Sequence, residues 1–456
     1  MRVTYWLEHA WLGTRVEPGV ALTVTDGRIA QLRTGVQAPP PGATVLRGLT
    51  LPGLANAHSH AFHRALRGTA QGGAPADGGP SVTDSFWTWR DVMYEVARNL
   101  TPDSYFALAR AVYAEMALAG ITCVGEFHYL HHQRGGTPYD NPNAMGEALI
   151  AAAAEAGLRI TLLDTAYLRG GLTRDGYQPL EGTQTRFGDG TADRWHDRWS
   201  LLKGGGHSRI GAALHSVRAF ADRDDYAAFA SWTAGAPTHV HLSEQPAENE
   251  ASLAFHGRTP TRLLADSGFW GPHTTAVHAT HLTAEDIALL GDAGSTVCMC
   301  PTTERDLADG IGPAPRLRRA GCPLSLGSDS HAVIDLFEEA RAMELNERLR
   351  SRTRGHWTAA ELLRAATEDG HASLGWTDAG RLVAGALADF TTIALDSVRT
   401  AGPAPRSGAA TAVFAATGAD VRHTVVAGRQ IVRDGRHQLV EDVPGALARA
   451  IAAVRR

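Results

Sequence analysis

Residue types that bind metal ions gather where short apolar runs of the sequence end. The run 48–60 ends in His58-Ser59-His60. Two histidines two positions apart on a β-strand point to the same side, so both imidazoles can reach one metal ion. A second pair of this kind, His239 and His241, lies in the run 238–242, and at most one of its members need be a ligand. Each pair alone is a weak signal for a metal site.

Three apolar runs are accompanied by side chains that suit hydrolytic chemistry. Glu244 follows the run 238–242, His278 ends another run, and Asp329 ends the last one. A structural role is a reasonable explanation for any one of these residues, but it does not account for the whole set. A metal ion lowers the pKa of a bound water molecule towards about 7, and nearby carboxylates and imidazoles can then move protons. The set therefore predicts metal-assisted hydrolysis.

The elements that must position these side chains follow a regular alternation. Eight short apolar runs, most of them rich in β-branched residues, are separated by stretches that can mostly hold a helix, such as 104–120 and 143–157. The eight runs are 48–60, 121–129, 159–167, 209–217, 238–242, 274–278, 295–300 and 323–329. Parallel strands with crossover helices are typical of this pattern, and eight units predict a closed (β/α)8 TIM-like barrel. Active sites of such barrels lie at the carboxyl ends of the strands, where the polar residues fall.

The two ends of the chain have a different pattern, typical of β-hairpins. The runs 20–24 and 29–32 flank Asp26-Gly27, a strong hairpin signal. The segments 388–393 and 425–432 have the same character. We predict a small β-sandwich domain built from residues 1–50 and 376–456, with the metal-dependent hydrolase barrel over residues 51–375. The Gly-, Ala- and Pro-containing segment 68–80 is predicted to be a mobile loop near the barrel mouth.

Composition restricts the partners of the chain. The 456 residues are 44% hydrophobic and 20% charged, with a formal net charge of −5. This charge gives no basic footprint for nucleic acid. No apolar run approaches the roughly 18 residues of a membrane span, and the first residues lack the features of a signal peptide. We therefore expect a cytoplasmic enzyme with a small-molecule substrate and with neither nucleic acid nor a membrane as a partner.

Taken together, the strand-end residues resemble the pattern of the amidohydrolase superfamily. That pattern is His58-x-His60 after strand one, single histidines after strands five and six, and an aspartate after strand eight. The flanking strings 51–57 and 385–389 fit it as well. The resemblance covers essentially the whole chain. It implies one Zn²⁺ per chain, for which Fe²⁺ is an alternative because it suits such ligands alike. The implied ligands are His58, His60, His241 and Asp329.

The resemblance extends to the mononuclear deaminases of this superfamily. Binuclear members carry a bridging carbamylated lysine at the end of strand four, but the single lysine here, Lys203, precedes that strand. Glu244, three residues after His241, is similar to the mononuclear branch. In that branch Asp329 would accept a proton from water, and His278 would orient the attacking oxygen and stabilise developing charge. Glu244 would deliver a proton to the departing nitrogen.

Local strings resemble those of formimidoylglutamate deiminases, which convert N-formimidoyl-L-glutamate to N-formyl-L-glutamate and ammonia in histidine degradation. The strings are 56–65, Ser85-Phe86-Trp87-Thr88-Trp89-Arg90, 125–129, His215-Ser216-Val217-Arg218, 241–245 and 300–304. Arginine suits such a substrate because its planar fork binds carboxylates bidentately. The resemblance implies a homodimer and the substrate-binding residues His63, Arg90, Tyr129, His215 and Arg218. His63 stands where such relatives often carry glutamine.

Two rival functions follow from the same sequence. A guanine- or triazine-type deaminase would use the same metal ligands, but would prefer aromatic stacking partners and amide groups to two arginines. A non-catalytic metal-stabilised barrel would be expected to lack at least one of Glu244, His278 and Asp329, and all three are present. The presence of the full set favours an enzyme.

Overall fold

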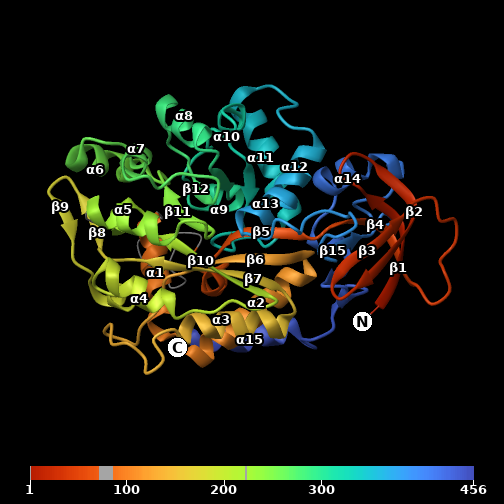
Figure 1. Ribbon diagram of the computed structural model, residues 1–456, viewed down its shortest axis with the longest axis horizontal. Helices are drawn as coiled ribbons and strands as arrows, with labels where there is room; N and C mark the ends of the chain where they lie inside the picture. The colour runs from red at the N-terminus through yellow and green to blue at the C-terminus, as the bar shows by residue number, and fades with distance from the viewer. Residues whose placement is uncertain (1, 71–85, 221–222, 456) are drawn as a thin grey trace, which may run out of the picture.

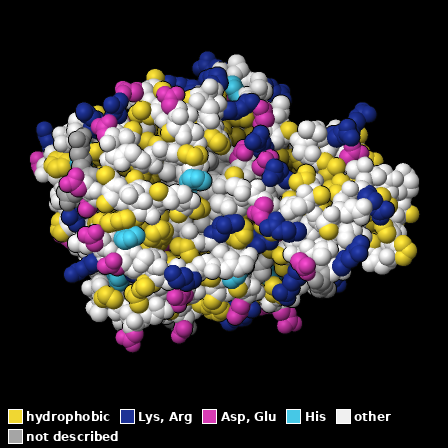
Figure 2. Space-filling model, viewed as in Figure 1, with side chains coloured by type: hydrophobic (Ala, Val, Ile, Leu, Met, Phe, Trp, Pro, Cys, Tyr) yellow, Lys and Arg dark blue, Asp and Glu magenta, His cyan; other side chains and the backbone are white. Residues whose placement is uncertain are grey.

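The computed structural model describes residues 2–70, 86–220 and 223–455. Figure 1 shows a barrel surrounded by helices, with a β-sheet packed at one end of the molecule. In Figure 2 basic and acidic side chains are interspersed on the face shown. No described helix combines the length and the apolar character that are needed to cross a membrane.

The barrel sheet consists of eight strands, and every observed pairing between neighbouring strands is parallel. They are β5 (Leu54–Ser59), β6 (Ile121–His128), β7 (Arg159–Ala166), β10 (Ser208–Leu214), β11 (Thr238–Leu242), β12 (Thr274–His278), β13 (Thr296–Met299) and β14 (Leu324–Leu326). Each overlaps one of the eight apolar runs, although the run 48–60 also contains the end of β4 (Thr44–Pro52), which belongs to the other sheet. The predicted (β/α)8 barrel is confirmed.

Closure of the barrel brings the last strand against the first. Ser59 and Asp329 form a parallel bridge, and the Asp329 amide donates to the His58 carbonyl oxygen at 3.0 Å. A Cβ atom at Gly327 would lie 2.7 Å from the His58 Cβ, so glycine allows this close approach. The closure places the predicted metal ligands of the first and last strands side by side.

Helices cover the outside of the barrel. They are α1 (Phe86–Asn99), α2 (Pro102–Leu118), α3 (Ala144–Ala156), α4 (Ala192–Ser200), α5 (Arg223–Trp232), α6 (Pro246–His256), α7 (Pro260–Asp266), α8 (Ala284–Asp292), α9 (Pro301–Asp306), α10 (Ala314–Arg319), α11 (Leu336–Ser351), α12 (Ala359–Ala366) and α13 (Glu368–Ser373). The predicted helical stretches 104–120 and 143–157 correspond to α2 and α3. Thr101 caps α2 in a capping box with Ser104, and Gly157 ends α3 at φ 82°.

Short elements complete the barrel mouth. The 3-10 helices η1 (Ala61–Leu66) and η3 (Val217–Ala219) follow β5 and β10, and a small hairpin of β8 (Gly171–Thr173) and β9 (Gly176–Gln178) follows β7. A further 3-10 helix, η2 (Gly182–Arg186), precedes α4. The predicted loop 68–80 lies mostly outside the described residues.

Both ends of the chain contribute to one further sheet, which confirms the small terminal β-domain. Its strands follow the order β18-β17-β16-β15-β4-β1-β2-β3. They are β1 (Arg2–Trp11), β2 (Val16–Thr25), β3 (Arg28–Arg33), β4 (Thr44–Pro52), β15 (Phe390–Ile393), β16 (Val421–Val426), β17 (Arg429–Arg433) and β18 (Arg436–His437). The same part of the chain forms η4 (Pro405–Ser407), α14 (Gly408–Phe414), η5 (Gly418–Asp420) and α15 (Val443–Val454). Helix α14 packs against α11 and α12, and α15 packs against α2 of the barrel. The domain boundaries at residues 50 and 376 stay a prediction.

The turn chemistry of this domain agrees with the sequence. Asp26 and Gly27 have φ values of 49° and 77°, as the hairpin turn between β2 and β3 requires. Strand β4 pairs with β15 in antiparallel register, and this pairing joins the two ends of the chain. The domain has a core of its own, in which Tyr5 packs edge-on against Phe390.

Candidate metal centre and active site

Four side chains from three strand ends converge at the barrel mouth. Their ligand atoms all lie within 4.8 Å of one another. Asp329 Oδ1 lies 3.4 Å from His58 Nε2 and 3.3 Å from His60 Nε2. His241 Nε2 lies 3.1 Å from His58 Nε2. All four residues are buried. The structure thus brings together the full set of predicted ligands, which are His58, His60, His241 and Asp329.

Backbone carbonyl groups hold two of these imidazoles in the orientation that a metal needs. His60 Nδ1 lies 2.9 Å from the Phe127 carbonyl oxygen, and His241 Nδ1 lies 3.0 Å from that of His215. A carbonyl oxygen can only accept, so each Nδ1 carries the proton and donates it. Each Nε2 is then left with a lone pair that faces the cluster.

The electrostatics of the cluster suit a divalent cation. Burial lowers the pKa of His58 to about 3 and holds the pKa of His241 well below its usual value, so both imidazoles are neutral. Burial alone would raise the pKa of Asp329, but the adjacent imidazoles of His58 and His60 and the charge of His278 outweigh it and hold that pKa well below its usual range. Neutral imidazoles and an ionised carboxylate are the protonation states in which these groups bind zinc. The donor set therefore fits the metal ion that the sequence predicts.

The strand ends carry unusual backbone conformations at the site. Ser243, His278 and Asp329 have φ values of 49°, 67° and 40°, in the left-handed region that residues other than glycine rarely adopt. Such conformations persist where the surrounding structure holds them, often at functional sites. Here they lie at the ends of β11, β12 and β14, where the polar side chains leave the barrel.

The predicted catalytic residues lie together next to the cluster. His278 Nε2 is 3.7 Å from Glu244 Oε1 and 3.6 Å from Asp329 Oδ2, and all three residues are buried. Burial alone would lower the pKa of His278, but the negative charges of Glu244, Glu304 and Asp329 raise it well above its usual value. A cationic imidazole beside carboxylates can stabilise negative charge that develops on a substrate.

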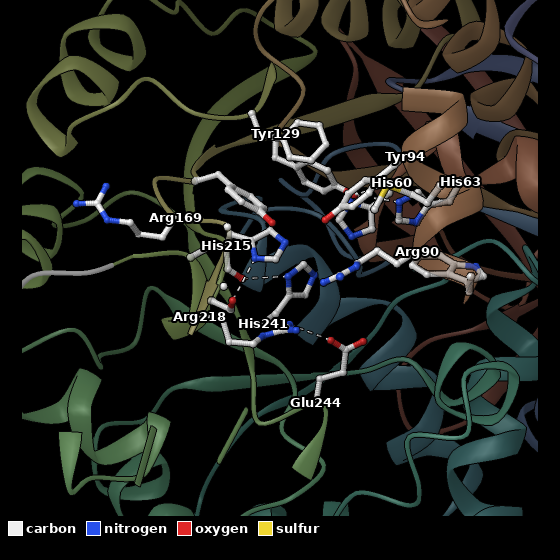
Figure 3. A pocket seen from close by; sticks show the side chains of 18 of the residues that line it. His60, His63, Arg90, Tyr94, Tyr129, Arg169, His215, Arg218, His241 and Glu244 are labelled. Atoms are coloured by element: carbon white, nitrogen blue, oxygen red, sulfur yellow. Dashed lines mark hydrogen bonds and ion pairs between the residues drawn. The ribbon is translucent and has the colours of Figure 1, made fainter. Parts of the chain in front are cut away.

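A cavity of ≈ 140 Å³ opens from the cluster and is lined by all the predicted substrate-binding residues. Figure 3 shows them around the site: His63, Arg90, Tyr129, His215 and Arg218. His63 Nε2 lies 3.1 Å from the Tyr129 hydroxyl oxygen, and the His63 ring lies 4.5 Å from the His60 ring, centre to centre. The replacement of the expected glutamine by His63 therefore keeps a polar contact with Tyr129.

Two arginines from opposite walls give the cavity its charge. Arg218, on η3, donates from Nη2 to Glu244 Oε2 at 3.5 Å. Arg90, on α1, reaches towards His241, whereas the guanidinium of Arg169 points away from the other labelled side chains (Figure 3). The Arg90 guanidinium also lies 5.5 Å from the ring centre of Tyr94. Two guanidinium groups that line one cavity suit a ligand with carboxylates, which arginine binds bidentately.

Sequence reasoning assigned no role to two buried acidic residues at the site, of which Glu304 belongs to the string 300–304 and Glu248 to no string. Glu304, at the start of α9, places Oε1 3.7 Å from His278 Nδ1. Glu304 follows the apolar run 295–300. The search for polar residues after apolar runs, which identified Glu244 and Asp329, could also have identified Glu304 as a site residue. Glu248, on α6, places Oε2 3.7 Å from Arg218 Nε. No strand-end signal marks Glu248, because it lies on a helix.

A second group of residues could ligate a metal ion by type, but its carboxylate is already bound by an arginine. His128, His131 and Asp164 lie close together in the barrel wall. Arg198 donates to both oxygens of Asp164, at 2.8 and 2.9 Å, and Trp195 donates to the same carboxylate at 2.9 Å. A permanent cation already neutralises this carboxylate, so we interpret the group as a structural network.

Comparison with known proteins gives curated relatives of similar length. The chain is 35% identical over 422 residues to the formimidoylglutamate deiminase of Pseudomonas aeruginosa, covering 90% of each chain. It is 30% identical over 400 residues to the 8-oxoguanine deaminase of the same organism, covering 84% of this chain and 83% of the relative. The chain thus resembles deaminases with two different substrates.

A solved structure and a family model agree with these relatives. The crystal structure of an amidohydrolase from Brucella melitensis matches with a TM-score of 0.90 and 31% identity over 100% of both chains. The amidohydrolase family model matches residues 49–431. The chain therefore belongs to the amidohydrolase family and is a hydrolase acting on carbon–nitrogen bonds other than peptide bonds.

Proposed function

We propose that this hydrolase converts N-formimidoyl-L-glutamate to N-formyl-L-glutamate and ammonia, a step of histidine degradation. The observation that carries the proposal is the pair Arg90 and Arg218, which line the same cavity as the metal cluster. The substrate bears two carboxylates, and each requires a cationic partner when it is buried. The 35% identity to a formimidoylglutamate deiminase supports the same choice.

We further propose that one Zn²⁺ per chain, or Fe²⁺ in its place, binds to His58, His60, His241 and Asp329. The fit rests on the inward-facing Nε2 atoms, the neutral imidazoles and the ionised carboxylate described above. When bound, a divalent cation polarises the substrate and activates water as a nucleophile at neutral pH by lowering its pKa.

The residues of the chain would then move the protons of the reaction. Water adds to the formimidoyl carbon, and the bond from that carbon to the terminal nitrogen breaks. Asp329 Oδ2, 3.6 Å from His278 Nε2, accepts a proton from the attacking water. Glu244 Oε1 takes up a proton that comes from the added water and passes it to the departing nitrogen, which leaves as ammonia. His278, with its raised pKa, stabilises the negative charge that develops on the oxygen.

The remaining cavity residues would hold the glutamate portion of the substrate. Arg218 and Arg90 bind the carboxylates, and Tyr129, His215 and His63 donate or accept hydrogen bonds around them. Fixing both carboxylates aligns the formimidoyl group with the metal cluster. It also restricts the rotation and translation of the bound substrate, so less entropy is lost on reaching the transition state.

The second candidate function is deamination of a purine, because the chain is 30% identical to an 8-oxoguanine deaminase. A purine carries no carboxylate that could bind to the guanidinium groups of Arg90 and Arg218, which line the cavity. The two guanidinium groups therefore favour the dicarboxylate substrate.

The test compares ammonia release from formimidoylglutamate, guanine and 8-oxoguanine under identical conditions. We expect kcat/KM for formimidoylglutamate to exceed the values for guanine and 8-oxoguanine by at least about a hundredfold, because only formimidoylglutamate has carboxylates that bind the cavity arginines. A higher kcat/KM for either purine would contradict the assignment. Homodimer formation and a cytoplasmic location stay predictions from the sequence.

A further inference from the structure

A buried carboxylate behind Arg218 has no role in the reaction described above. Glu248 lies on α6, and only 1% of its surface is exposed. Its Oε2 atom lies 3.7 Å from Arg218 Nε. Among the described residues, no side chain donates a hydrogen bond to either of its carboxylate oxygens. A buried carboxylate held in this way requires an explanation.

The geometry around the guanidinium suggests that Glu248 positions it. Glu248 lies next to Nε, whereas Glu244 accepts from Nη2 at 3.5 Å. These two contacts leave Nη1 for a third group. Two carboxylates at different nitrogen atoms fix the plane of a guanidinium, which a single contact cannot do.

The charge balance changes when a substrate carboxylate arrives. In the free site Arg218 contacts two anions, Glu244 and Glu248, of which Glu244 also faces the cationic imidazole of His278. A substrate carboxylate adds a third anion to the same guanidinium, in a region where water is excluded. Like charges that share one buried partner cannot all stay ionised, so one of the carboxylates takes up a proton. Glu248 is fully enclosed by protein and gains least from solvent.

We propose that Glu248 holds Arg218 in the orientation that receives a substrate carboxylate, and that Glu248 takes up a proton when that carboxylate binds. This inference rests on the proposed function, because it needs a carboxylate-bearing ligand. It adds a positioning residue to the site and predicts that ligand binding is linked to a proton.

The ionisation of Glu248 agrees with this role. Burial raises the pKa of Glu248 to about 7, although the charge of Arg218 opposes the rise. The charge of Glu244, after β11, raises the pKa further, whereas the Glu244 backbone amide and the charge of His278, at the end of β12, lower it. At pH 8 a group with this pKa is roughly 90% ionised in the free site, so it can accept close to one proton.

The experiment is isothermal titration calorimetry of the metal-loaded protein with N-formyl-L-glutamate, the proposed product, at pH 8. Titrations in two buffers with different ionisation enthalpies give the number of protons taken up per ligand bound. Glu248→Gln keeps the size of the side chain but cannot titrate. Glu250→Gln, at an exposed position on the same helix, is the matched control.

We expect the wild-type protein and Glu250→Gln to take up more protons per ligand than Glu248→Gln, by up to about one proton, as for a single titrating site. Protons linked to the metal ion are common to all three proteins and cancel in the difference. Equal uptake by the wild-type protein and Glu248→Gln would overturn the inference. Loss of the uptake in Glu244→Gln but not in Glu248→Gln would also overturn it, because the proton would then belong to Glu244.

The Glu248→Asp variant and ligand binding to the wild-type protein give two further measurements that test the role of Glu248. If Glu248→Gln does not fold, Glu248→Asp keeps a titratable group and should retain the uptake, with Kd raised at least about fivefold because the shorter side chain positions Arg218 less well. Unchanged affinity in Glu248→Asp would argue against the positioning role. Binding of N-formyl-L-glutamate to the wild-type protein without proton uptake would overturn this inference alone. No detectable binding to that protein would overturn the proposed function and the inference with it.

Discussion

Replacement of Arg218 by methionine tests how the cavity recognises its ligand. Methionine keeps much of the apolar length of the side chain and deletes the charged fork. The side chain of Arg218 is 16% exposed and that of its partner Glu244 is 8% exposed, so the guanidinium lies in a region of weak solvent screening. A substrate carboxylate that binds there in wild type would be left without its cation in the variant.

The size of the effect follows from that burial. Loss of one partner from a buried ion pair costs about 3–5 kcal/mol, and each 1.4 kcal/mol corresponds to about tenfold in kcat/KM. We therefore expect kcat/KM for formimidoylglutamate to fall by between about a hundredfold and a few thousandfold. Metal content should stay unchanged, because Arg218 is not among the residues of the metal cluster.

The assay measures ammonia release by the wild-type protein and the variant, with formimidoylglutamate and with formamidine, which has no carboxylate. The matched control is Arg169→Met, since Arg169 lines the same cavity but its guanidinium points away from the site (Figure 3). We expect a change of less than about threefold in this control, as for surface charges. Equal losses by Arg218→Met on the charged and the neutral substrate would refute the reasoning, because Arg218 would then support the fold or the metal cluster.

Three other predictions concern the proton shuttle, the pocket and stability. Glu244→Gln should retain the metal and the fold but lose at least about a hundredfold in kcat, since it removes a proton donor; near-native turnover would assign Glu244 a structural role. His63→Gln, which can still hydrogen-bond Tyr129, should change kcat/KM less than about tenfold, whereas His63→Leu should lose more, and steady-state kinetics of both variants check this. Burial lowers the pKa of His131 and of His239 to about 4, so the unfolded chain binds more protons than the folded one below pH 6.5. The free energy of unfolding should therefore fall as the pH decreases from 6.5 to 4, and urea unfolding that shows no such decrease would contradict the neutral state of these histidines.

The barrel and the metal cluster could be predicted because strand ends are local features of the sequence. Each polar residue there directly follows an apolar run, and a parallel barrel brings all such ends to one face. His58, His278 and Asp329 were found in this way. The choice between His239 and His241 needed the resemblance, and the structure agrees with it, because His239 Nε2 lies 3.1 Å from the Ser373 carbonyl oxygen, away from the cluster.

The features that could not be predicted depend on contacts between distant parts of the chain. Glu248 contacts Arg218 although the two residues are 30 positions apart in the sequence. Its burial follows from the packing of α6 against η3 rather than from a sequence motif. The hydrogen bond between His63 and Tyr129 spans 66 residues in the same way. The single sheet that joins the two chain ends through β4 and β15 was predicted as a domain, but its strand order was not.

The most direct test of the central claim is a metal titration of the metal-free protein, in which ammonia release and bound metal are quantified in the same sample. The account predicts that activity on formimidoylglutamate rises linearly to a plateau at one ion per chain, and that N-formyl-L-glutamate forms in an amount equal to the ammonia. Full activity without a bound ion, or a plateau that requires two ions per chain, would contradict the account.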